Sequence, residues 1–230
     1  MPTYESMRAG YRALWSRMAI LPGKRAAAES AAKRIIAGKA RYQAIETATG
    51  VPWIFVGLTH LRESSLNFST YLGNGQALNK KTTIVPKGRG PFPSFEEGAR
   101  DALLLHNLDA IKEWPLERLA YELERWNGFG YLGKINSPYL WGGSTLQQPG
   151  KYIRDHVFDP TVMDEQLGCL TVLAAMASFD ADAAALQAAE KPQDSPKSSP
   201  APVQPPHPQS APASQSGGWL TAIVRIIASI

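Results

Sequence analysis

At 230 residues the chain is long enough for one domain with its own hydrophobic core and shorter appendages. Its single cysteine, Cys169, excludes an intramolecular disulfide, and its place in the apolar run 167–176 predicts core packing. The formal net charge of +4 favours anionic partners without choosing among them. The basic residues near the N-terminus are spread along helical patterns, which is typical of solvated helix faces.

The first 21 residues carry scattered charges and no apolar core segment, so they do not resemble a secretory signal peptide. No stretch reaches the roughly 18 apolar residues that a membrane-spanning helix needs. We therefore expect synthesis in the cytoplasm without a signal peptide.

Apolar spacings of three and four predict an amphipathic helix over 4–21, and strong helix formers predict another over 24–49. Pro52 suits the first turn of a third helix, 53–68. Repeated Gly and Pro then interrupt the pattern, with a short β-branched run among them. We predict a loop and a small β-hairpin within 71–93.

Ser94, followed by acidic residues, predicts the start of a helix that runs to about Glu113. The next helix should span 115–126 and end at an Asn-Gly pair. Residues 129–150, rich in Gly, Pro and aromatic side chains, predict a structured surface loop. A last helix over about 164–189 closes the domain.

The composition changes to Pro, Ser, Gln and Ala at 191–216, which predicts a disordered linker. The apolar tail 217–230 is too short to span a bilayer, and it either lies on a membrane surface or docks onto protein. We therefore expect a mainly α protein, with an N-terminal amphipathic helix (1–23), a catalytic domain (24–190), the linker and an amphipathic tail.

The predicted third helix brings Val56, His60, Glu63 and Asn67 onto one face through spacings of four, three and four. This places Glu63 where apolar neighbours could shield it from water. A shielded carboxyl group tends to stay protonated near neutral pH, as a general acid must. The alternative is an ordinary glutamate on a solvated helix surface.

An ordered set of motifs accompanies Glu63. It opens a Glu-Ser-Ser run, a Gly-rich segment follows, and 125–131 reads Arg-Trp-Asn-Gly-Phe-Gly-Tyr. This order resembles the lytic transglycosylase and goose-type lysozyme group, in which the acid opens a Glu-Ser pair and a Tyr-Asn-Gly motif lines the same cleft. Trp126 stands where that group usually has Tyr. The segment 137–141, Ser-Pro-Tyr-Leu-Trp, is similar to lysozyme-like phage endolysins, and the resemblance covers about 40–180.

The resemblance implies a lysozyme-like fold with a cleft that binds sugars. Aromatic side chains would stack on pyranose rings and amides would bond N-acetyl groups. Trp126 and Trp141 could equally fill the core, whereas the Gly- and Pro-rich surroundings of Tyr131 and Tyr139 favour the cleft. The predicted substrate-binding residues are Ser64, Gln76, Thr83, Asn127, Tyr131 and Tyr139.

Glycosidases normally use two carboxylates, but no Asp or Glu occurs from Ser64 to Phe95. Two mechanisms therefore remain open. Glu63 acts alone, as acid and then base, or it acts with a water molecule that Thr83 positions. A distant carboxylate such as Glu124 is a less favoured third possibility, because a solvated helix face or a pairing with a nearby basic side chain explains it equally well.

We expect the chain to cleave peptidoglycan glycan strands between N-acetylmuramic acid and N-acetylglucosamine, as a phage or prophage endolysin acting on the cell wall. A non-catalytic wall-binding or virion component, or a lysis protein acting on membranes through its tail, are the alternatives. We predict a monomer that needs no cofactor and binds no nucleic acid. No metal site is expected, because the histidines are widely scattered: His60, His106, His156 and His207.

Overall fold

The computed structural model describes residues 2–154 and 156–188, which are mainly helical, as predicted. The helices are α1 (Tyr4–Arg17), α2 (Arg25–Ala37), α3 (Lys39–Thr49), α4 (Trp53–Ser64), α5 (Phe95–Leu105), α6 (Leu116–Asn127), α7 (Pro138–Trp141), α8 (Cys169–Met176) and α9 (Ala181–Ala188). Short 3-10 helices occupy Pro22–Lys24 and Leu108–Ala110. The predicted linker, 191–216, and tail, 217–230, lie outside the described residues.

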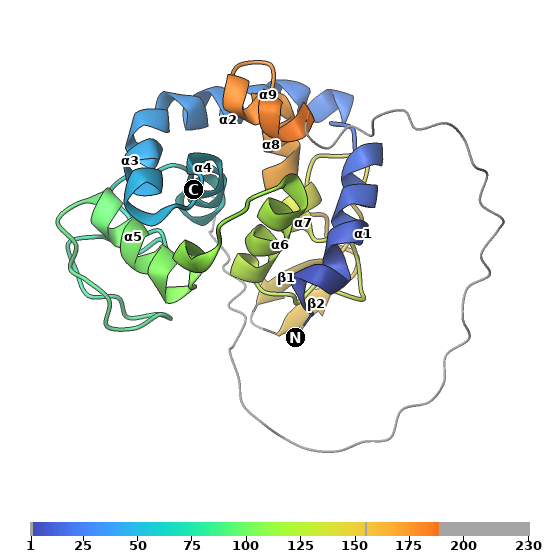
Figure 1. Ribbon diagram of the computed structural model, residues 1–230. Coiled ribbons are helices and arrows are strands. Elements are labelled where there is room, and N and C mark those ends of the chain that lie inside the picture. Colours follow the sequence, from blue (N-terminus) through green and yellow to red (C-terminus); the bar gives the residue numbers. More distant parts are fainter. Residues whose placement is uncertain (1, 155, 189–230) are drawn as a thin grey trace.

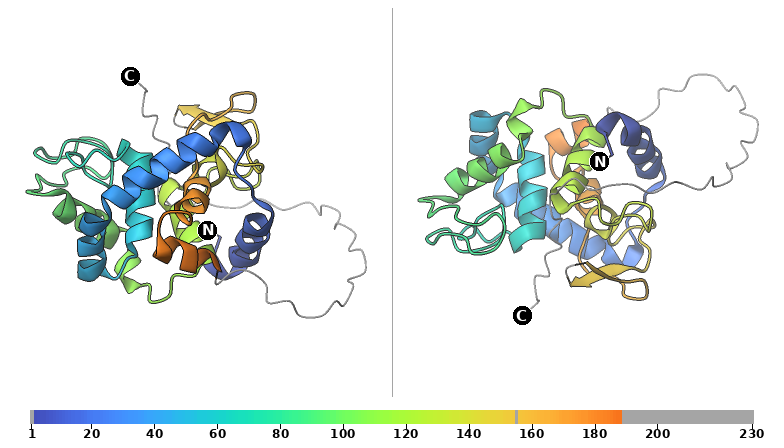
Figure 2. Two further views of the ribbon diagram at one scale, coloured as in Figure 1. Left: turned by 90° about the horizontal axis from the view of Figure 1, so that it is seen from above. Right: turned by 90° about the horizontal axis from the view of Figure 1, so that it is seen from below.

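Helix α4 occupies the centre of the fold. In Figures 1 and 2, α3, α5 and the loop 65–94 lie on one side of it, and α1, α6 and the small sheet lie on the other. Nine of its residues are buried, from Trp53 to Glu63. Gly57 allows α2 to approach closely, because a Cβ there would lie 2.6 Å from the Ile35 side chain. A rigid, buried helix thus carries Glu63.

Helix α4 ends four residues earlier than predicted. Ser65 and Leu66 adopt left-handed backbone angles, with φ of 52° and 66°, and the Ser65 N–H donates to the Leu61 carbonyl. Asn67 is consequently exposed and caps a turn by accepting a hydrogen bond from the Ser69 N–H. The predicted face that included Asn67 therefore stops at Glu63.

Four other predicted helices are shorter than expected. The first, predicted over 4–21, ends at Arg17. The helix over 24–49 breaks at Gly38, where a Cβ would meet the Tyr42 ring at 2.8 Å. The helix begun at Ser94 ends at Leu105, because Asn107 turns left-handed with φ of 54°. The last helix starts late and divides into α8 and α9, which are bent by 110°.

The predicted β-hairpin within 71–93 is wrong. That segment consists of turns and bends, with one isolated bridge between Thr70 and Ala77. The antiparallel strands form instead at β1 (Lys151–Arg154) and β2 (Val157–Asp159), where Tyr152 lies opposite Phe158. Turn residues dominate the first segment, whereas aromatic side chains stabilise the second pairing.

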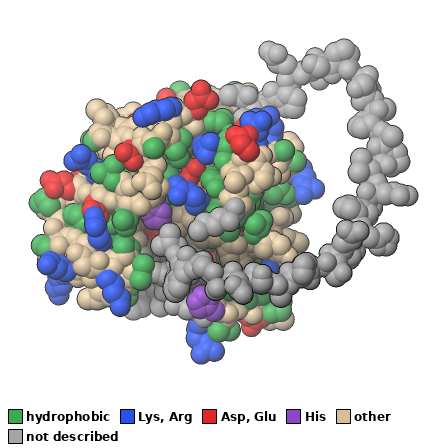
Figure 3. Space-filling model, turned by 60° about the horizontal axis from the view of Figure 1, so that its bottom comes forward, with side chains coloured by type: hydrophobic (Ala, Val, Ile, Leu, Met, Phe, Trp, Pro, Cys, Tyr) green, Lys and Arg blue, Asp and Glu red, His purple; other side chains and the backbone are tan. Residues whose placement is uncertain are grey.

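Helix α1 packs along α6 and shares the core of the following helices through Tyr11. Within the described ranges no single helix is long and apolar enough to cross a membrane; only the bent pair of α8 and α9 meets that test of length and composition. Figure 3 shows Lys and Arg side chains scattered around one face of the molecule.

Candidate active site

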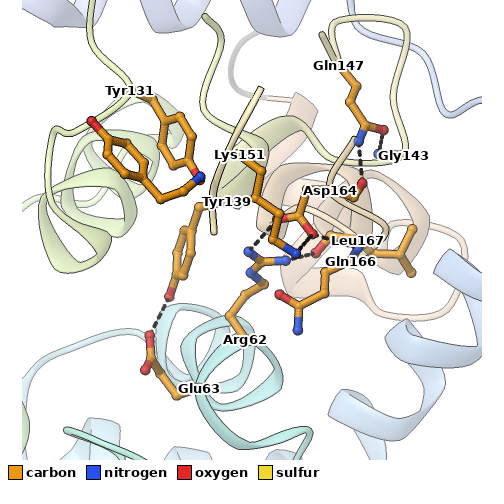
Figure 4. Close-up of polar contacts among 11 residues, drawn as sticks. Arg62, Glu63, Tyr131, Tyr139, Gly143, Gln147, Lys151, Asp164, Gln166 and Leu167 are labelled. Carbon is orange, nitrogen blue, oxygen red and sulfur yellow. Dashed lines mark hydrogen bonds and ion pairs between the residues drawn. The ribbon is translucent and has the colours of Figure 1, made fainter. Parts of the chain in front are cut away.

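Glu63 lies in the last turn of α4, and only 8% of its surface is exposed. The Tyr139 hydroxyl, from α7, donates a long hydrogen bond of 3.3 Å to Glu63 Oε1 (Figure 4). The predicted shielding of this glutamate is confirmed, because helix α4 buries it and α7 covers it.

Tyr139 is itself buried, and it keeps its proton. Burial raises the pKa of the Tyr139 phenol well above its ordinary value, and the neighbouring Glu63 charge raises it further. The phenol therefore remains a hydrogen-bond donor, with Glu63 Oε1 as acceptor. Its predicted contact with sugar stays a prediction.

The Gly-rich segment lies against the end of α4. A Cβ on Gly75, whose φ is +68°, would be 3.0 Å from the Glu63 carbonyl oxygen. The Gln76 side chain then joins the two arms of the loop: its Nε2 donates to Thr83 Oγ1 at 2.9 Å, and its Oε1 accepts the Thr83 N–H at 2.8 Å. The fold thus brings the predicted residues Gln76 and Thr83 together, beside the helix end that carries Glu63.

The other predicted substrate-binding residues are more dispersed. Ser64 donates its hydroxyl to the His60 carbonyl within α4, and Asn127 is the half-buried last residue of α6. Tyr131 is buried in an aromatic cluster with Tyr152, whose N–H donates to the Tyr131 hydroxyl oxygen. The part of these three residues in substrate binding stays a prediction.

The distant carboxylates considered as a second acid are engaged within the fold. Glu124 accepts a hydrogen bond from the Tyr11 hydroxyl at the α1–α6 interface. Glu122 is held between Arg118 at 3.2 Å and Arg125 at 2.6 Å. Both side chains are buried, and the solvated helix face or basic partner predicted for Glu124 is wrong, because its partner is the Tyr11 hydroxyl.

A buried ionic cluster beside Glu63 was not predicted. Arg62 pairs with Asp164 at 3.6 Å, and Asp164 also contacts Lys151 at 3.3 Å. The adjacency of Arg62 to Glu63 is visible in the sequence. Nothing in the sequence indicates Asp164, because it lies 102 positions further along the chain and folding alone brings it near.

Cys169 is buried in the core, as predicted, with its sulfur 3.8 Å from the Leu58 carbonyl oxygen. Burial raises the pKa of the Cys169 thiol to about 12, so at neutral pH it is not a thiolate nucleophile. Within the described residues, no group of His, Cys, Asp and Glu side chains is arranged to hold a metal ion.

The chain matches no protein-family model, no curated protein and no solved structure. Its function is therefore argued from the site. A shielded carboxyl group on a rigid helix, hydrogen-bonded by a phenol and bordered by a polar loop, is suited to donating a proton to a bound substrate and accepting one back.

Proposed function

We propose that this protein cleaves the glycan strands of bacterial peptidoglycan between N-acetylmuramic acid and N-acetylglucosamine, with Glu63 as general acid. The observation that carries the proposal is the burial of Glu63 at the end of α4, with the Tyr139 hydroxyl donating to its Oε1. A general acid must be held in place and shielded from bulk water, and this carboxyl group meets both conditions. The ordered motifs around Glu63 add the resemblance to lytic transglycosylases and lysozymes.

In the proposed reaction Glu63 first donates its proton to the glycosidic oxygen, so the bond to C1 of N-acetylmuramic acid breaks and the N-acetylglucosamine end leaves as an alcohol. The Glu63 carboxylate then takes the proton from the C6 hydroxyl of the same muramic acid, whose oxygen attacks C1. The product carries a 1,6-anhydro end and consumes no water. The engagement of Glu122 and Glu124 by other side chains favours this version over one with a second carboxylate.

The biological setting follows from the same proposal. The similarity of the segment 137–141 to lysozyme-like phage endolysins supports a phage or prophage endolysin that acts on the cell wall. The proposed reaction needs no cofactor, because acid and base are supplied by one carboxyl group.

The direct test is Glu63→Gln, which preserves the shape of the side chain but removes the proton donor. Digestion of purified peptidoglycan should fall by about 100-fold to 10,000-fold, with circular dichroism and thermal unfolding unchanged. Glu124→Gln is the matched control, since it is also a buried glutamate that accepts a tyrosine hydroxyl. If folded Glu63→Gln keeps more than about a tenth of the activity, Glu63 is not the acid.

Mass analysis of the digestion products separates the two mechanisms. Anhydro ends support Glu63 as sole acid and base, whereas reducing ends require water as the acceptor. A wild-type protein that binds purified peptidoglycan without releasing either product would instead be a wall-binding component.

A further inference from the structure

Arg62 precedes Glu63 on α4, and its side chain is only 8% exposed. Its guanidinium pairs with Asp164, of which 4% is exposed, and donates to the Leu167 carbonyl oxygen at 3.2 Å. Arg62 Nε has no hydrogen-bond partner among the described residues. Two opposite charges are thus withdrawn from water beside the proposed acid.

Such a pair is not explained by stability. Removing two charges from water costs free energy that their attraction only partly offsets, and well-packed apolar residues often stabilise a fold as much. An unpartnered buried N–H adds to that cost. The contacts of the Arg62 guanidinium therefore indicate what the pair does.

The guanidinium carbon of Arg62 lies 4.8 Å from the centroid of the Tyr139 ring. The hydroxyl of the same ring donates to Glu63, so Tyr139 links two consecutive residues of α4 (Figure 4). A planar guanidinium packs on aromatic faces in a way that an ammonium group does not. Asp164 holds Arg62 in that place, and Lys151 and the Gln166 N–H hold Asp164.

We propose that Arg62, fixed by Asp164, is a positioning residue that holds the Tyr139 ring so that its hydroxyl stays on Glu63. This inference rests on the proposed role of Glu63 as the acid. Arg62 acts through Tyr139 and does not touch the reacting atoms. Asp164, which the chain supplies from outside the helices of the site, thus contributes to catalysis by fixing an arginine.

A double-mutant cycle tests this chain of contacts. Arg62→Gln and Tyr139→Phe should each lower kcat on soluble peptidoglycan glycan strands by about 10-fold, with KM changed less than about twofold. Both changes act on the hydrogen bond from Tyr139 to Glu63, so the double variant should also lose about 10-fold. A loss of about 100-fold, the product of the single effects, would show that Arg62 does not act through Tyr139.

Arg118 provides a matched control in the same protein. Its guanidinium lies over the Tyr4 ring at 3.4 Å and pairs with buried Glu122 at 3.2 Å. Arg118→Gln removes an equivalent contact away from Glu63, so it should leave kcat unchanged even where it lowers the unfolding temperature. An equal fall in kcat for Arg118→Gln would reduce Arg62 to a residue needed only for folding. Arg62→Lys, which keeps the charge without the planar group, should recover less than half of the lost rate.

A measurement without turnover distinguishes a failure of this inference from a failure of the proposed function. In the full chain labelled at tyrosine ζ-carbons, Arg62→Gln and Glu63→Gln should both shift the Tyr139 NMR signal, and Arg118→Gln should not. If the wild-type protein cleaves nothing but these shifts appear, the contacts stand and the proposed function fails. If Arg62→Gln leaves the Tyr139 signal in place, the positioning role is wrong whatever the protein cleaves.

Discussion

His60 lies one turn before Glu63 and is fully buried among aromatic rings. Its Nδ1 is 2.9 Å from the Tyr42 hydroxyl oxygen, and the rings of Phe68 and Phe95 lie 4.8 and 4.3 Å away, centroid to centroid. Burial lowers the pKa of His60 to about 4, below the ordinary 6.5 that it regains on unfolding. The folded protein therefore holds this side chain neutral at physiological pH.

The pH dependence of stability follows from that shift. Between pH 6.5 and pH 4, His60 binds a proton in the unfolded chain but not in the folded protein. The free energy of unfolding should therefore decrease as the pH is lowered through this range, by roughly 3 kcal/mol at most. His60→Gln should remove this part of the slope, as measured by urea unfolding at pH 7 and pH 4.5. The exposed His156, changed to Gln, is the control. An unaltered slope in His60→Gln would contradict the assignment.

Replacing Thr83 distinguishes the two groups that could attack C1, which are the C6 hydroxyl of the same muramic acid and a water molecule. If Glu63 works alone, Thr83→Ala should loosen the loop joined by Gln76 and lower kcat/KM by less than about 10-fold, with anhydro products unchanged. If Thr83 instead holds the attacking water, turnover should collapse. Product analysis by mass spectrometry beside the initial rate distinguishes these outcomes.

Between elements, the α1–α6 interface contains a buried Tyr11–Glu124 pair. Burial raises the pKa of Glu124, and the Tyr11 hydrogen bond partly opposes that rise. Tyr11→Phe should therefore lower the free energy of unfolding by about 1 to 3 kcal/mol at pH 7. The loss should shrink near pH 4, because the carboxyl group is then protonated before and after unfolding.

Tyr121→Phe is the comparison for this element, since its hydroxyl donates to the Pro2 carbonyl near the chain end and not to a buried acid. Its effect on unfolding should be smaller and independent of pH between 4 and 7. A Tyr11→Phe variant as stable as wild type in thermal and urea unfolding would mean that Glu124 needs no partner. Neither change should alter the products of glycan cleavage.

For the whole molecule, the composition of 191–230 predicts that these residues take no part in the cleavage of glycan strands. Removing these residues should leave digestion of purified peptidoglycan largely unchanged, because a Pro- and Ser-rich linker supplies no packed wall for a cleft. Action on whole Gram-negative cells or binding to anionic lipid vesicles should decrease. Equal vesicle binding with and without 191–230 would end the membrane interpretation of the tail.

Local chemistry was readable from the sequence. Apolar periodicity predicted the helices, the Ser94 side chain caps α5 by accepting the Glu97 N–H, and Gly50 ends α3 with a φ of 75°. Glu63 was also expected to be shielded, and only 8% of its surface is exposed. These features depend on residues only a few positions apart.

Only the tertiary structure decided the surroundings of Glu63. Tyr139 reaches it across 76 positions, and Asp164 reaches Arg62 across 102, so no local pattern encodes either contact. Packing also decides two further features. Ser65 ends α4 with a left-handed backbone, and the paired strands form at 151–159 and not within 71–93 as predicted. The physical reason is common to all of them: periodicity and capping report short-range hydrogen bonds, whereas burial and ion pairing are settled by which distant segments the core brings together.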